Sequence, residues 1–165
     1  MCPNEDLKHS LLDDSVTQDR EDGPTVNVCD SHCHFFSQQF FQRLAEETSS
    51  TSHSGVKDIT RRLGWESPGS PKELAMRWID ELDRNRVERA ALIASTPGDE
   101  KSVSIALAEY PHRFVGFFMV NPLQEKAQEK VSRAITDLGL KCVCLFPAMH
   151  NYKMHDGRVI KLKTP

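Results

Sequence analysis

The alternation of short apolar runs with amphipathic helical patterns is the feature that most constrains the fold of this chain. Candidate strands lie at residues 26–29, 90–94, 113–120 and 142–146, and helical patterns at residues 38–47, 70–85, 103–110 and 124–138 separate them. Strands joined through helices pair in parallel by right-handed crossovers. The pattern therefore predicts an α/β fold, and by itself it leaves open whether the sheet is open or part of a barrel.

The helix at residues 70–85 has the clearest start signal. Ser70 is a good N-cap, Pro71 suits the first helical position, and Glu73 can complete a capping box. The apolar residues of this segment share one face at helical spacing: Leu74, Trp78, Ile79 and Leu82. Gly139 is the expected left-handed stop of the helix at residues 124–138.

The first 23 residues differ in composition from the rest of the chain. Residues 1–23 hold seven acidic and two basic side chains with few apolar positions, too little apolar surface to offset the entropy of ordering. We therefore expect a disordered acidic leader at residues 1–23 and a folded domain at residues 24–165. The small polar residues of 48–55 predict a loop inside that domain.

Charge and hydropathy narrow the classes of partner. The chain has 21 Lys and Arg against 24 Asp and Glu, a formal net charge of −3, so it lacks the clustered basic excess that nucleic acids and anionic membranes attract. It also contains no apolar run long enough for a membrane helix and no secretory signal. We expect a cytoplasmic protein that binds neither nucleic acid nor membrane.

The segment Asp30–His34 follows the first predicted strand, at the end where α/β folds place their sites. Side chains two apart in extended backbone point the same way, so His32 and His34 can converge on one ion. Imidazole suits zinc and similar divalent metals, and Asp30 can add a weak ligand or orient an imidazole. The alternative is a pair of polar residues at the sheet edge, and the βαβ context favours the metal site.

Other candidate residues receive plainer interpretations. Among the remaining histidines, His53 and His112 are expected at the surface, and His150 and His155 in solvated loops. Cys142 and Cys144 lack the spacing of common zinc or redox motifs, so we predict small buried strand residues. Trp65 and Trp78 are expected in the core or a lid.

Several segments together resemble the amidohydrolase-related branch of the amidohydrolase superfamily, which includes aminocarboxymuconate-semialdehyde decarboxylase. Residues 28–35, with His32 and His34, are similar to its strand-one signature, and residues 76–93, 108–117 and 138–150 are similar to its later strand and helix junctions. The resemblance spans about residues 25–159 and implies the first four βα units of a (β/α)₈ TIM barrel. A complete barrel takes about 250 residues, so the chain of 165 is identified as the N-terminal half of such a domain, truncated or alternatively ended.

The resemblance implies a metal-dependent hydrolase that cleaves a C–N or C–O bond in a small carbonyl or carboxylate substrate by metal-activated water, with zinc as the first choice of metal. Two alternatives stay open: a metal-dependent decarboxylase of the same branch, and a catalytically silent βα fragment that acts through association. Many relatives carry a strand-four histidine or another polar residue where Phe146 stands, which argues against a second, bridged metal. Unpaired strand edges in a half barrel also predict a homo-oligomer.

Overall fold

The computed structural model of the protein describes residues 27–48 and 55–162. The predicted leader at residues 1–23, His53 and most of the predicted loop at 48–55 lie outside the described residues. The helices and strands, in chain order, are β1 (Val28–Phe35), α1 (Gln38–Thr48), α2 (Val56–Leu63), α3 (Pro71–Arg84), β2 (Val87–Ala94), α4 (Glu100–Glu109), β3 (Phe114–Met119), α5 (Ala127–Thr136), β4 (Cys142–Cys144), α6 (Pro147–His150) and α7 (Gly157–Leu162).

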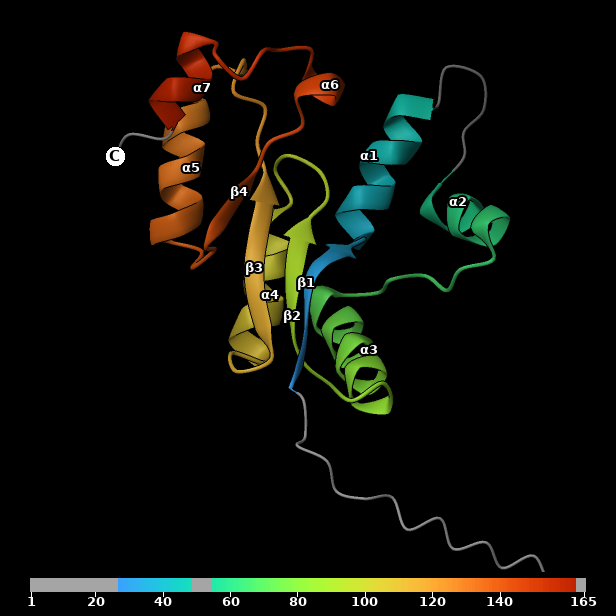
Figure 1. Ribbon diagram of the computed structural model, residues 1–165. Helices are drawn as coiled ribbons and strands as arrows, with labels where there is room; N and C mark the ends of the chain where they lie inside the picture. The colour runs from blue at the N-terminus through green and yellow to red at the C-terminus, as the bar shows by residue number, and fades with distance from the viewer. Residues whose placement is uncertain (1–26, 49–54, 163–165) are drawn as a thin grey trace, which may run out of the picture.

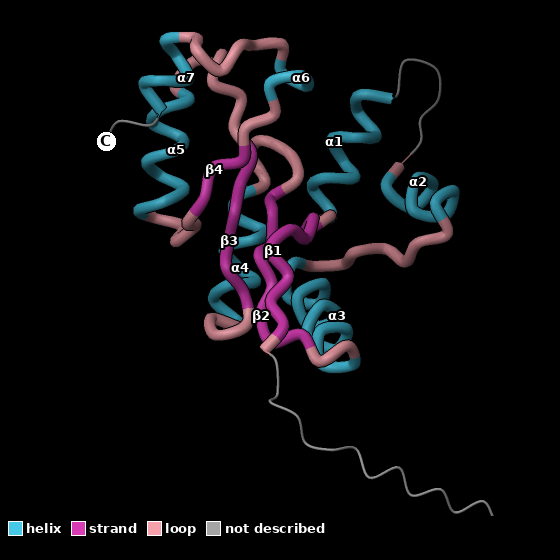
Figure 2. Tube along the Cα trace, in the orientation of Figure 1, coloured by secondary structure: helices cyan, strands magenta, loops and turns pink. Residues whose placement is uncertain are grey.

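The four strands form one parallel sheet in the order β1-β2-β3-β4. This confirms the predicted α/β class, and the arrangement matches consecutive βα units of a barrel. Figure 1 shows the strands running side by side, with α1 and α6 beyond their arrowheads. Figure 2 shows the same path by secondary structure. Consecutive strands are neighbours, so the loops after them all emerge at one edge of the sheet.

The core lies between one face of the sheet and α3, α4 and α5. β2 is its centre, and Leu92, Ile93 and Ala94 are fully buried. Small side chains let the helices approach the strands closely, among them Ala75 of α3, Ala106 of α4 and Ala134 of α5. Parallel strands are normally covered on both faces and read as continuous apolar runs, which is how β2 was recognised from the sequence.

The start of α3 is as predicted. Ser70 Oγ accepts the backbone N–H of Glu73 at 3.3 Å, and a Glu73 carboxylate oxygen accepts the backbone N–H of Ser70 at 2.7 Å. Leu74, Trp78, Ile79 and Leu82 contact the core from this helix, and the expected stop at Gly139 has φ of 73°. Reciprocal capping fixes where α3 begins, and so the path of the segment that leads into it.

Two predictions about the fold need correction, and one helix was not predicted. β1 begins two residues later than predicted and runs on through Phe35, so the histidine motif belongs to the strand instead of following it. The sequence also gave no sign of α2, whose eight residues Val56–Leu63 contain only one fully buried side chain, Thr60. Cys142 is exposed and Cys144 half-buried, because β4 ends the described sheet and only β3 pairs with it. No described helix has the length and apolarity to cross a bilayer.

Candidate metal centre

A bulge in β1 sets the direction of the two histidines. Asp30 pairs with Ala90 and Cys33 pairs with Leu92, so two residues of β1 stand opposite one residue of β2. Such a bulge re-aims the side chains that follow it. Beyond it Cys33 and Phe35 point into the core, with 5% and 0% of their surface exposed, and His34 is half-buried, while His32, within the bulge, is exposed.

His32 and His34 lie together, with their Nε2 atoms 3.2 Å apart and their rings edge to face. Two nitrogens bound to one zinc at the usual bond length in tetrahedral geometry lie about 3.3 Å apart. The observed separation therefore suits a shared ion. The structure thus brings together the pair that the sequence singled out.

Ser95, at the carboxyl end of β2, orients His34. His34 Nδ1 lies 3.0 Å from Ser95 Oγ, and the Ser95 hydroxyl donates to the Ile93 carbonyl at 3.1 Å. Because the single hydroxyl hydrogen is used there, His34 Nδ1 is the donor to Ser95, and its Nε2 keeps a lone pair directed at His32. Metal-binding histidines typically donate their other ring N–H in this way.

The surroundings also favour an uncharged His34. Burial lowers the pKa of His34, and the neighbouring His32 lowers it further, which keeps the ring in the neutral form that a metal binds. One face of the ring stacks on Phe36, with centroids 5.4 Å apart and planes at 3°. The ring is therefore held from its edge and from its face.

Asp30 contacts the backbone beside the pair. Its Oδ1 accepts the backbone N–H of His32 at 2.9 Å, and this bond is the main reason that the pKa of Asp30 is lowered. Burial, with Asp30 adding to it, raises the pKa of the Cys33 thiol to about 12, so Cys33 is a poor candidate ligand. The predicted roles of Asp30, as weak ligand or as partner of an imidazole, stay predictions.

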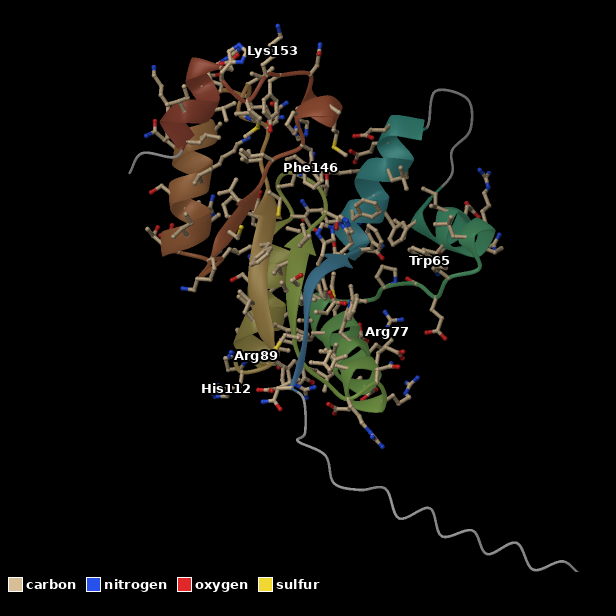
Figure 3. All side chains as sticks on the ribbon, viewed as in Figure 1. Trp65, Arg77, Arg89, His112, Phe146 and Lys153 are labelled. Carbon is tan, nitrogen blue, oxygen red and sulfur yellow. The ribbon has the colours of Figure 1, made fainter. Side chains whose placement is uncertain are left out.

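A cavity of ≈ 480 Å³ opens beside the histidines and is called the histidine cavity here. Its walls include His32 and His34 from β1, the indoles of Trp65 and Trp78, and Arg77 of α3. Figure 3 shows Trp65 near α2 and Arg77 on α3. Trp78 contacts the core, whereas Trp65 is 50% exposed and lines the opening.

Arg77 holds the segment that closes one side of the histidine cavity. Its guanidinium donates to Glu66 Oε2 at 3.2 Å, to the Ser67 carbonyl at 3.1 Å and to the Pro68 carbonyl. Bonds to successive carbonyls fix the path between α2 and α3, and in this way Arg77 positions Trp65. These bonds engage the guanidinium, so it is not available for a ligand alone. Sequence reasoning missed both Arg77 and Ser95. The position of Ser95, immediately after a buried strand, was the available signal.

His32 and His34 are two candidate metal ligands, and the described residues supply no complete set. Within residues 27–48 and 55–162, no group of three or more His, Cys, Asp or Glu side chains could hold a metal ion. Catalytic zinc usually has three protein ligands and an open position. His32 and His34 thus fit part of a metal site. His112 and His155 are exposed as predicted, and Phe146 is half-buried just after β4.

Comparison with known proteins supports the fold. The chain is similar to the crystal structure of a probable 2-pyrone-4,6-dicarboxylic acid hydrolase from Acinetobacter baumannii with citric acid bound, with a TM-score of 0.51 and 15% identity. The similarity covers 83% of this chain and 44% of that one, so the chain spans less than half the length of the protein it resembles. No family model matches the sequence. No curated protein matches it either.

Proposed function

We propose that His32 and His34 are two ligands of a divalent metal, with zinc as the first choice. The observation that carries this proposal is the 3.2 Å separation of their Nε2 atoms, together with the Ser95 contact that leaves His34 Nε2 as an acceptor. The neutral imidazole that burial favours at His34 is the form that coordinates zinc.

We further propose that the βα units belong to a metal-dependent hydrolase of the amidohydrolase superfamily, acting on a C–N or C–O bond of a small carbonyl or carboxylate substrate. The metal would supply an activated water and polarise the substrate carbonyl. His32 and His34 hold the ion, Ser95 orients one of them, and the indoles of the histidine cavity cover the substrate. The name of the similar solved structure, a probable hydrolase, supports hydrolysis over decarboxylation.

Metal binding tests the proposal directly. Zinc titration of the metal-free protein should show a site that is lost in His32→Ala and in His34→Ala and kept in His112→Ala, because His112 is exposed and lies beside Arg89 at the amino ends of β2 and β3 (Figure 3). Mn²⁺ should broaden the ring signals of His32 and His34 before those of His112. Equal broadening of all three rings would remove the basis for a metal enzyme and favour the catalytically silent fragment.

Association with a second copy is part of the same proposal. Among the described strands, β1 and β4 each pair with one neighbour only, and exposed edges of parallel sheets favour further pairing. Sedimentation over a range of protein concentrations should show a dimer or higher species. A monomer at all concentrations would contradict it. A cytoplasmic location also stays a proposal from the sequence.

A further inference from the structure

A second cavity, of ≈ 520 Å³, lies at the carboxyl ends of β2 and β3, between α1 and α6. We call it the α1–α6 cavity, and its polar lining includes Arg43, Ser95, Thr96, Asn121 and His150. In Figure 1, α6 lies above the loop that follows β2, and α1 lies to the right of that loop. Ser95 lies between the two cavities. It lines this one, and its hydroxyl oxygen contacts His34 of the histidine cavity. Ligands of α/β folds bind at this edge of the sheet.

His150 lines this cavity, and its ring carries a buried nitrogen without a partner in the described part of the chain. Its Nδ1 is buried and has no hydrogen-bond partner among the described residues, although a buried polar nitrogen normally has one. The ring lies parallel to Tyr152, with centroids 6.4 Å apart and planes at 16°, and Tyr152 is itself only 8% exposed. The expectation of a solvated His150 is therefore wrong. The ring is partly buried, and burial lowers its pKa.

The side-chain amide of Asn121 offers a hydrogen-bond donor in the lining of the α1–α6 cavity. Its side-chain oxygen accepts the backbone N–H of Leu123 at 3.0 Å, which directs the amide nitrogen to the other side. No described residue accepts a hydrogen bond from that nitrogen. The amide group is thus anchored at its acceptor end and keeps its donor end for a ligand.

Arg43 supplies a positive charge to the lining of the α1–α6 cavity. A Cβ at Gly98 would lie 2.9 Å from Arg43 Nη2, so the guanidinium rests against the turn that precedes α4. Gly98 has φ of 94°, and the absence of a side chain there lets the guanidinium approach. The buried Asp99 next to it interacts with this charge and helps to keep the guanidinium at the cavity.

We propose that the α1–α6 cavity binds the carboxylate of a small organic anion through Arg43, Asn121 and His150. A carboxylate has up to about four lone-pair sites for donors, and guanidinium matches its geometry. Glu47, the carboxylate among the described lining residues, is exposed, as is Arg43, so solvent screens its repulsion and the attraction of Arg43 alike. Met119 and Met149 supply apolar contact for the carbon skeleton. This site does not depend on the metal proposed at His32 and His34.

Malonate is a suitable probe, and malonamide, which has the same skeleton without charge, is its control. Titration of metal-free protein followed by NMR should shift the ring signals of His150 with malonate and not with malonamide. Arg43→Gln should weaken malonate binding at least tenfold, while Arg84→Gln, an exposed residue of α3 paired with Glu81, should leave it unchanged.

The proposal would be overturned by the absence of a malonate shift at His150, by equal binding of malonamide, or by equal weakening in Arg84→Gln, which would indicate general charge attraction. Arg43 lies beside the buried Asp99, so Arg43→Gln can also disturb folding. His150→Gln serves as the second variant, since it removes the imidazole and leaves the charge of Arg43 in place. It should weaken malonate binding too, and unchanged binding would contradict the proposal. The titration contains no metal, so its failure is distinct from a failure of zinc binding.

Discussion

His34 and Ser95 join the ends of two neighbouring strands through one hydrogen bond of 3.0 Å. They are 61 positions apart in the sequence, and the parallel pairing of β1 with β2 brings them together. The Ser95 hydroxyl is uncharged, so it acts on the His34 ring through hydrogen bonding alone. It accepts the ring N–H and so decides which nitrogen of His34 faces His32.

Replacing Ser95 should therefore weaken the metal site while the fold persists. We expect Ser95→Ala to lower zinc affinity about 10-fold to 100-fold, the usual effect of removing the partner of a ligating histidine. Nitrogen NMR of the metal-free protein should show His34 shifting toward a mixture of tautomers. Ser104→Ala, on α4, is the matched control and should change neither reading. An unaltered His34 tautomer in Ser95→Ala would show that another group orients the ring.

A buried carboxyl group couples the turn after β1 to the start of α4. Asp99 is fully buried, and its Oδ2 accepts the Ser37 hydroxyl at 2.5 Å while its Oδ1 accepts the Ser102 hydroxyl. Asp99→Ala should leave both hydroxyls without this partner. Each buried unsatisfied group costs about 1–3 kcal/mol, so for the two hydroxyls we expect a loss of about 2–6 kcal/mol in urea unfolding. A loss below about 0.5 kcal/mol would show that this contact contributes little.

Asp99 also gives stability a particular pH dependence. Burial raises the pKa of Asp99 above the ordinary 3.8, although both hydroxyls act in the opposite direction. The folded state therefore binds the Asp99 proton more tightly than the unfolded chain does. The stability that this proton binding contributes is lost as pH rises through the raised pKa. Relative to Asp99→Asn, which does not titrate, the protein should lose stability from about pH 4 upward. Parallel stability curves for the two proteins would contradict this.

Features that depend on residues close together in the sequence could be predicted, and features that depend on distant segments could not. The capping box at Ser70 and Glu73 is local, and periodicity within β2 and α3 reports burial directly, so these elements were predicted well. The pairing of His32 with His34 was also local. Ser95, Arg77 and the cavity at His150 were not, because each depends on contacts between segments that only the folded sheet brings together. α2 escaped because its one buried side chain is a threonine.

The close packing of β3 against α4 yields the last prediction. A Cβ at Gly116 would lie 2.9 Å from a methyl carbon of Leu107 and 3.1 Å from Cγ of Leu140. Leu140 is fully buried, so it has little room to move. We expect Gly116→Ala to destabilise the protein by about 1–3 kcal/mol, the usual cost of overpacking a core, as measured by urea unfolding. Gly157→Ala is the matched control, since a Cβ there meets nothing within 4 Å. Equal stability of the two variants would mean that Leu107 adjusts freely and that the seam between β3 and α4 is looser than these distances indicate.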